Sequence, residues 1–143
     1  MNELKKGKIL GVDYGDKRTG LARSDSSEFL ASGIGYISPG GMKSTAEEVA
    51  KIAIENKCSA IVVGLPKNMD GSEGWRAETI RAFAQMLGEL VKCEIILYDE
   101  RLSTMQAHRM LSITDIKSKK RKQVIDTLSA QIILQNYLDS KRR

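Results

Sequence analysis

The chain has 143 residues, of which 41% are hydrophobic and 29% are charged. This composition is ordinary for a globular protein and argues against a disordered chain or a fibrous repeat, and the length predicts a single domain over residues 1–143. The net charge of +5 mildly favours a polyanionic partner such as nucleic acid.

Counts of particular residues exclude several kinds of site. Cys58 and Cys93 are too far apart for a zinc cluster or a redox motif, so we expect both in the core of a protein from a reducing compartment. His108 is the only histidine, which excludes a site built on several imidazoles. No apolar run suits a signal peptide or a membrane span, so a cytoplasmic protein without membrane contact is expected.

Three short strands are predicted in the first part of the chain. Residues 8–14 and 19–24 read as strands joined by a hairpin, and a third strand over 30–37 ends at Pro39-Gly40-Gly41. Apolar residues at helical spacing then predict a helix over 45–56, with Ser44 or Thr45 as its cap.

Helices and strands alternate in the rest of the chain. The continuous apolar run 58–63 is typical of a strand buried on both faces of a parallel sheet. The elements predicted after it are a helix over 78–91, a strand over 93–98, a helix over 104–111, a polar basic connection over 112–122 and a last helix over 124–138. This order predicts an α/β fold with a five-stranded mixed sheet, three antiparallel strands followed by parallel ones, flanked by helices. An RNase H-like fold is one arrangement that fits.

Three acidic residues lie at the ends of apolar elements. Asp13 follows the first strand, and Asp126 shares a stripe with apolar residues near the start of the last helix. After the fifth strand, alternation cannot choose between Asp99 and Glu100. Two carboxylates about 4 Å apart repel each other by roughly 4 kcal/mol at an effective dielectric near 20, so converging acids would need cations or protons.

Such a carboxylate cluster is a typical site for Mg²⁺ or Mn²⁺, and a pair of these ions can hydrolyse a phosphodiester. Each acid also has an ordinary explanation. Asp13 could cap a turn, Asp126 could favour the positive end of a helix, and Glu100 could pair with Arg101 at the surface.

Basic residues border the proposed site. Lys17 and Arg18 belong to the first hairpin and could contact a phosphate, although a solvated turn is the simpler interpretation. The glycine-rich loop 64–74 resembles an anion-binding turn but lacks the Walker pattern. Trp75 could stack on a base, but packing is the commoner role for a single tryptophan at a helix start. The stretch 117–122 carries five cations just before Asp126, and such runs are usually only solvated.

Four sequence blocks, in order, resemble the YqgF group of Holliday junction resolvases, also described as pre-16S rRNA nucleases. The blocks are Gly11-Val12-Asp13-Tyr14-Gly15 with Lys17-Arg18-Thr19-Gly20, Val63-Gly64-Leu65-Pro66 with Asn68-Met69-Asp70-Gly71-Ser72, Asp99-Glu100-Arg101-Leu102-Ser103-Thr104, and Asp126 in the last helix. The resemblance implies an RNase H-like nuclease with a two-metal site for Mg²⁺ or Mn²⁺ formed by Asp13, Glu100 and Asp126. It selects Glu100 over Asp99. Ser129 stands where family members often have alanine, and no consequence is expected from that change.

A nucleic-acid surface is expected beside the acidic site. The residues expected to form it are Lys17, Arg18, Asn68, Arg101, Lys119, Lys120, Arg121 and Lys122. The family description covers two substrates, the 5′ end of pre-16S rRNA and a four-way DNA junction, and the sequence does not choose between them. Junction cleavage would require a homodimer. A nucleic-acid-binding factor that no longer cleaves is the alternative from another functional class.

Overall fold

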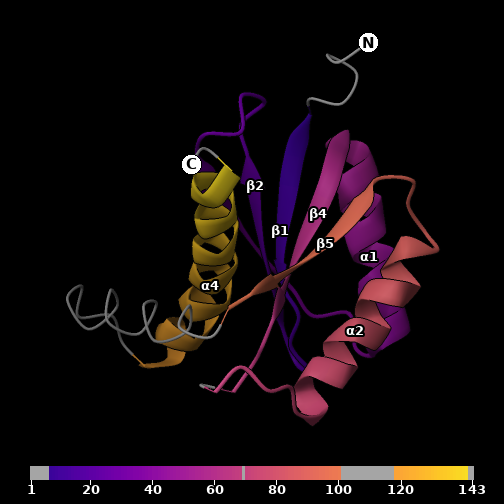
Figure 1. Cartoon of the computed structure of the whole chain (residues 1–143), viewed down its shortest axis with the longest axis vertical. Coiled ribbons are helices and arrows are strands. Elements are labelled where there is room, and N and C mark those ends of the chain that lie inside the picture. The colour runs from indigo at the N-terminus through magenta and orange to yellow at the C-terminus, as the bar shows by residue number, and fades with distance from the viewer. Residues whose placement is uncertain (1–6, 69, 101–117, 142–143) are drawn as a thin grey trace.

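The computed structural model describes residues 7–68, 70–100 and 118–141, without the side chains of residues 118–123 (Figure 1). Its elements in chain order are β1 (Lys8–Asp13), β2 (Thr19–Ser24), β3 (Ala31–Ile37), α1 (Met42–Glu55), β4 (Cys58–Leu65), α2 (Trp75–Gly88), β5 (Glu94–Asp99) and α4 (Ser118–Lys141). The five predicted strands are confirmed, with ends that move by one or two residues. The helix predicted over 104–111 lies outside the described residues.

The five strands form one mixed sheet with the order β3-β2-β1-β4-β5. β1 pairs antiparallel with β2, and β2 pairs antiparallel with β3, whereas β1 with β4 and β4 with β5 are parallel. This confirms the predicted sheet. Because parallel strands end at the same edge, the fold brings the carboxyl ends of β1, β4 and β5 together.

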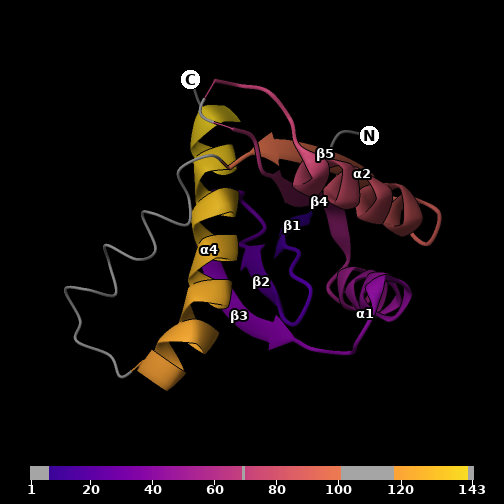
Figure 2. The ribbon, with the colours of Figure 1, turned by 90° about the horizontal axis from the view of Figure 1, so that it is seen from below.

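Helices cover both faces of the sheet. α1 and α2 lie on one face and α4 crosses the other (Figures 1 and 2). One buried cluster joins α1 and α2 to the sheet through side chains such as Val49, Phe83 and Val63. A second cluster joins α4 to the opposite face through Ile133, Leu134 and Val62. Both faces of β1 and β4 are therefore buried, which explains their continuous apolar sequences.

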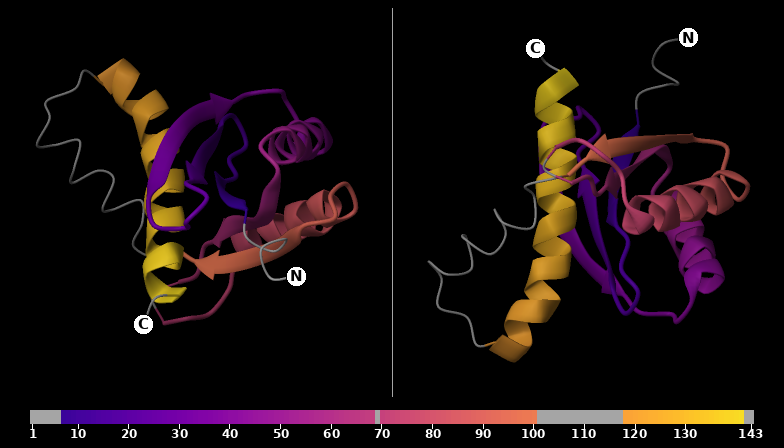
Figure 3. Two further views of the ribbon diagram at one scale, coloured as in Figure 1. Left: turned by 90° about the horizontal axis from the view of Figure 1, so that it is seen from above. Right: turned by 60° about the horizontal axis from the view of Figure 1, so that its bottom comes forward.

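Glycines on the sheet let α4 approach closely. A Cβ on Gly20 of β2 would lie 1.7 Å from the carbonyl oxygen of Asp126, and one on Gly33 of β3 would lie 2.5 Å from the Cγ2 of Thr127. No side chain fits in either gap. The middle of α4 is thus fixed against β2 and β3, with its long axis running across the sheet as the further views show (Figure 3).

Helix starts differ most from the sequence prediction. α1 begins at Met42 with Gly41 as its N-cap residue, and the Thr45 hydroxyl donates a hydrogen bond to the Gly41 carbonyl instead of capping the helix. α2 begins at Trp75, three residues before the predicted start. α4 begins at Ser118, so residues 118–122 are helical and the predicted connection over 112–122 is wrong for that part. No described helix is both long and apolar enough to cross a membrane.

Candidate active site

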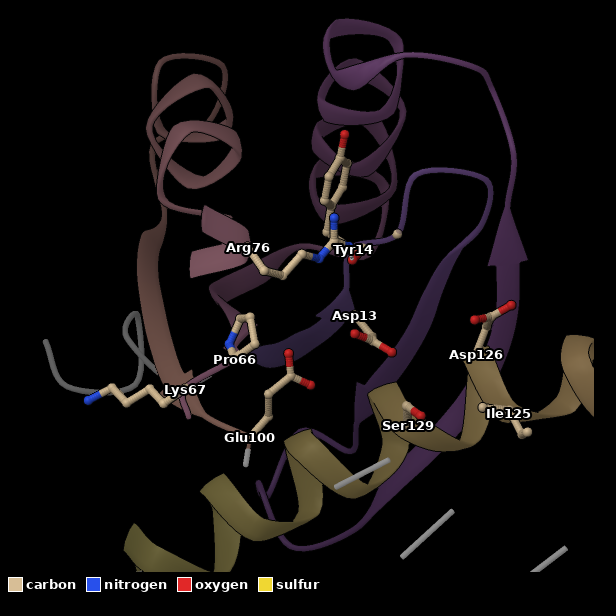
Figure 4. A pocket seen from close by; sticks show the side chains of 10 residues that line it. Asp13, Tyr14, Pro66, Lys67, Arg76, Glu100, Ile125, Asp126 and Ser129 are labelled. Carbon is tan, nitrogen blue, oxygen red and sulfur yellow. Dashed lines mark hydrogen bonds between the residues drawn. The ribbon is translucent and has the colours of Figure 1, made fainter. Parts of the chain in front are cut away.

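A pocket at the carboxyl edge of the sheet contains the three predicted acids. Asp13 ends β1, Glu100 follows β5, and Asp126 lies on α4 (Figure 4). The pocket has a volume of about 370 Å³. Its lining residues are Asp13, Tyr14, Gly15, Pro66, Lys67, Arg76, Glu100, Ile125, Asp126 and Ser129. The sheet and α4 therefore bring together acids that are far apart in the sequence.

The carboxyl group of Glu100 fits beside β4 because Gly64 has no side chain. A Cβ on Gly64 would lie 2.9 Å from the carboxyl carbon of Glu100, so only glycine at this point of β4 accommodates the carboxyl group without a shift. The Glu100 amide also donates to the Leu65 carbonyl at 3.1 Å, which continues the pairing of β5 with β4 past the end of β5. Glu100 is among the pocket-lining residues, and Asp99, the alternative from strand alternation, is not.

Asp13 and Glu100 influence each other's ionisation. Burial, followed by the negative charge of Asp126, raises the pKa of Asp13 to about 7. Burial, followed by the charge of Asp13, raises the pKa of Glu100 to about 8. Arg76 opposes both shifts but does not cancel them. The pocket thus holds two carboxyl groups whose negative charge the surrounding protein does not compensate.

Asp126 is held by a cation from the first hairpin. The Arg18 Nε donates to the Asp126 Oδ2 at 2.5 Å. Asp126 is the ninth residue of α4, and no acid lies in the first turn of that helix, so its suggested role at the positive end of a helix is wrong. Figure 4 shows Glu100 and Asp13 with their carboxyl groups turned toward each other. Asp126 lies to one side of this pair, on α4.

The donor set suits a hard divalent cation. Carboxylate oxygens are the ligands that Mg²⁺ and Mn²⁺ prefer. The Ser129 hydroxyl lies in the pocket wall, 1% of the residue is exposed, and its oxygen has no hydrogen-bond partner among the described residues. A buried hydroxyl of this kind normally bonds to water or a ligand. Asp13 and Glu100 therefore fit a cation, with Ser129 available to one of its waters.

The third acid is not in position as a ligand. Within the ranges that the structure describes, no three acidic, histidine or cysteine side chains are close enough to form a ready metal cluster. In the same region Arg18 contacts the Oδ2 of Asp126, so a cation there would compete with the guanidinium for that oxygen.

The predicted nucleic-acid residues have different surroundings. Lys17 is exposed in the hairpin, and Arg18 pairs with Asp126. Asn68 donates its side-chain amide to the Ser72 hydroxyl at 3.0 Å and so stabilises its own loop. Arg101 and the side chains of Lys119, Lys120, Arg121 and Lys122 lie outside the described residues.

Sequence reasoning missed two cations and one hydroxyl in the pocket. Arg76 donates to the Tyr14 carbonyl at 2.6 Å and to Asp16 at 3.2 Å, and its guanidinium lies 5.6 Å from the Tyr14 ring centroid. Lys67 and Ser129 complete this set. The helix prediction that began at residue 78 left Arg76 in a loop, and nothing in the sequence placed it near Asp13. Ser129 was expected to have no consequence, yet it lines the pocket.

Comparisons with known proteins agree on one family. Residues 7–140 match the family model RuvX, described as Holliday junction resolvase. The chain is 45% identical over 136 residues to a Bacillus cytotoxicus protein named "Putative pre-16S rRNA nuclease", and the match covers 94% of this chain and 99% of the relative. A Geobacillus protein of the same name is 46% identical over 137 residues, with the same coverage.

Solved structures share the fold at low sequence identity. The T. thermophilus RuvC bound to a Holliday junction substrate has a TM-score of 0.56 at 13% identity, covering 95% of this chain and 96% of that one. The fowlpox virus resolvase bound to Holliday junction DNA has a TM-score of 0.57 at 15% identity, covering 95% of this chain and 99% of that one. These resemblances confirm the RNase H-like fold.

Proposed function

Because the chain belongs to the RuvX family of Holliday junction resolvases, we propose that it is a metal-dependent endonuclease that processes the 5′ end of pre-16S rRNA. The names of its close relatives support the RNA substrate. The observation that carries the proposal is the pocket at the carboxyl edge of the sheet, which Asp13, Glu100 and Asp126 all line. Its site of action would be the cytoplasm, where the ribosomal precursor is processed.

In this proposal Asp126 has a different role from Asp13 and Glu100. Asp13 and Glu100 bind a divalent cation, Mg²⁺ or Mn²⁺, through oxygens that burial leaves poorly compensated, and Asp126 joins them once Arg18 has moved to a substrate phosphate. When bound, the metal supplies a more acidic water and charge stabilisation at the scissile phosphate, with a pair of ions serving both the attacking and the leaving oxygen. Ser129 orients a water by hydrogen bonding.

Cations around the pocket neutralise the substrate. Lys67 and Arg76 lie in the pocket wall, and Lys17 and Arg18 lie on the neighbouring hairpin. Asn68, Arg101, Lys119, Lys120, Arg121 and Lys122 remain proposed nucleic-acid contacts on the strength of the sequence alone. Phosphate contacts of this kind position a strand without reading its sequence.

A cleavage assay tests the proposal. Purified protein is incubated with an RNA containing the 5′ end of pre-16S rRNA, in Mg²⁺, in Mn²⁺ and in EDTA. We expect cleavage only with metal. Asp13→Asn and Glu100→Gln should each slow it by at least about a hundredfold, which corresponds to roughly 2.7 kcal/mol of transition-state stabilisation. Glu47→Gln, an exposed acid on α1, is the matched control and should cleave normally. Cleavage in EDTA, or full activity of Asp13→Asn, contradicts the proposal.

Resolution of a four-way DNA junction is the second candidate. The family description and the junction-bound structures of the same fold favour it. Symmetric cuts across a junction require two active sites, and hence a homodimer. A four-way junction in the same assay, combined with the molar mass in solution by light scattering, separates the two substrates.

A binding factor that does not cleave is the third candidate. The pairing of Arg18 with Asp126 favours it, because this contact removes one acid from the metal site. Salt-sensitive binding of nucleic acid without cleavage in any divalent metal would establish this candidate and exclude the other two.

A further inference from the structure

Trp75, which immediately precedes the pocket-lining Arg76 in the chain, places a large aromatic ring in solvent. It is the only tryptophan in the chain, and it is 72% exposed as the first residue of α2. The packing role that is commoner for such a residue is therefore wrong here. A single exposed apolar side chain is not unusual by itself, so its neighbours must decide what this one does.

The next residue, Arg76, joins Trp75 to the site. Its guanidinium lines the pocket that holds Asp13 and Glu100. Within the described part of the chain, its bonds to the Tyr14 carbonyl and to Asp16 use two of its five N–H donors. The contact with Tyr14 fixes the guanidinium, while other donors can reach an anion. An exposed ring and an anchored, pocket-lining cation thus occupy successive positions at the start of α2.

The backbone that carries Trp75 is held in place. Arg81 forms a bidentate pair with Glu73, with distances of 2.9 Å and 2.8 Å, and this pair ties the segment before α2 to the helix. The Thr79 hydroxyl donates to the Trp75 carbonyl at 3.1 Å. An aromatic side chain on a fixed backbone loses little conformational entropy when a ligand covers it, because only two χ angles are left to order.

We propose that Trp75 and Arg76 form a nucleotide subsite, in which Arg76 binds a phosphate next to the scissile one and Trp75 stacks on the adjoining base. This inference rests on the proposed nuclease function and specifies its substrate class. In the interior of a duplex both faces of a base are covered by its neighbours, so an internal base can stack on an external indole only when it is unpaired. The subsite therefore selects strands with an unpaired nucleotide at the cleavage position.

Fluorescence of the single tryptophan tests the subsite directly. The Asp13→Asn protein, which should bind without cleaving, is titrated with a labelled single strand and with the same strand in a continuous duplex. Binding is followed independently by anisotropy of the label. At saturation we expect the single strand to quench Trp75 emission, because stacking brings a base onto the ring, and the duplex to leave the emission nearly unchanged.

The outcomes separate this inference from the proposed function. Saturated binding of the single strand with unchanged emission overturns the subsite and leaves the nuclease proposal intact. Equal quenching by strand and duplex overturns the preference for an unpaired base. If anisotropy shows no binding of either nucleic acid, the proposed function fails and the subsite fails with it.

Substitutions provide a second measurement. Trp75→Ala should weaken single-strand binding by about 5- to 100-fold, the usual range for loss of one base stack, with little effect on the duplex. Trp75→Phe should restore part of the loss because it keeps an aromatic face. Ile54→Ala removes a similarly exposed apolar side chain, 63% exposed on α1, and should change neither affinity. An equal loss for strand and duplex in Trp75→Ala would contradict base stacking.

Discussion

The contact between Arg18 and Asp126 competes with both metal binding and phosphate binding in the pocket. While Arg18 binds Asp126, this carboxylate is neutralised without metal, and the positive charge of the guanidinium is shared with a carboxylate instead of a phosphate. Metal and substrate would both pull the pair apart, one by taking the carboxylate and the other by taking the cation. A single ion pair thus opposes the assembly of the active site in the absence of its ligands.

Arg18→Ala should therefore change metal and substrate binding in opposite directions. Without its partner, Asp126 is free to ligate, so Mn²⁺ affinity measured by calorimetry should rise by about two- to fivefold, the range expected for release of a partly exposed ion pair. Nucleic-acid affinity should fall, because a phosphate contact is lost. Lys17→Ala removes the same charge from the same hairpin and should leave Mn²⁺ affinity unchanged. Weaker Mn²⁺ binding in Arg18→Ala would show that the pair does not compete with metal.

At the scale of elements, the position of α4 decides whether Asp126 reaches the pocket. α4 comes from the end of the sequence, yet its backbone at Asp126 packs directly on Gly20 of β2. The apolar residues Ile133 and Leu134 fix the same helix about two turns later. Gly20 of β2 therefore helps to set the position of Asp126 in the acidic pocket.

Gly20→Ala should disrupt the close packing of α4 on β2. The added Cβ would lie 1.7 Å from the Asp126 carbonyl oxygen, which is backbone and cannot swing away. Overpacking of this kind typically lowers the free energy of unfolding by about 1–3 kcal/mol, so the urea midpoint should fall clearly. The cleavage rate of the folded protein should also fall, because Asp126 moves.

Gly88→Ala is the matched control for that substitution. A Cβ there would meet the Ile95 Cγ1 at 3.7 Å, an ordinary contact, and alanine favours a helix over glycine. Its stability should equal or exceed that of the unmodified protein. If Gly20→Ala unfolds at the same urea concentration as the parent chain, α4 does not need the close approach.

At the scale of the whole molecule, sequence patterns predicted the sheet better than the site. Period-two and continuous apolar runs mark strands directly, so all five strands and the mixed order followed from the sequence. The helix starts shifted: Thr45, an expected cap, and Glu78, the expected first residue of the next helix, both lie inside helices. Asp13 was found because it ends a strand, whereas the family resemblance selected Glu100 over Asp99 and supported Asp126, which is the ninth residue of α4. Arg76, Lys67 and Ser129 were not found, because their meeting depends on tertiary packing, which no local pattern encodes.

The charge of the whole pocket should make stability depend on pH and metal. Without metal, burial holds the pKa of Asp13 near 7 and that of Glu100 near 8, above the ordinary values of 3.8 and 4.5. The folded state therefore binds more protons than the unfolded chain between about pH 4 and pH 8, and its stability from these groups falls as the pH rises through that window. A bound cation removes this penalty because it replaces the protons.

Thermal unfolding in EDTA and in Mn²⁺ at pH 5 and pH 8 measures this linkage. In EDTA, Asp13→Asn should lose less stability between pH 5 and pH 8 than the parent chain, since it carries one titrating acid fewer. Mn²⁺ should raise the Tm of the parent chain at pH 8 by about 3 °C or more, a shift that corresponds to roughly 1 kcal/mol in a domain of this size, and much less at pH 5, where protons occupy the carboxylates. Glu47→Gln should follow the parent chain throughout, because its carboxylate lies exposed on α1. If Mn²⁺ raised the Tm of the parent chain equally at pH 5 and pH 8, the cation would bind elsewhere, since only competition with protons at these acids ties metal affinity to pH in this range. The same conclusion would follow if Mn²⁺ raised the Tm of Asp13→Asn at pH 8 as much as that of the parent chain.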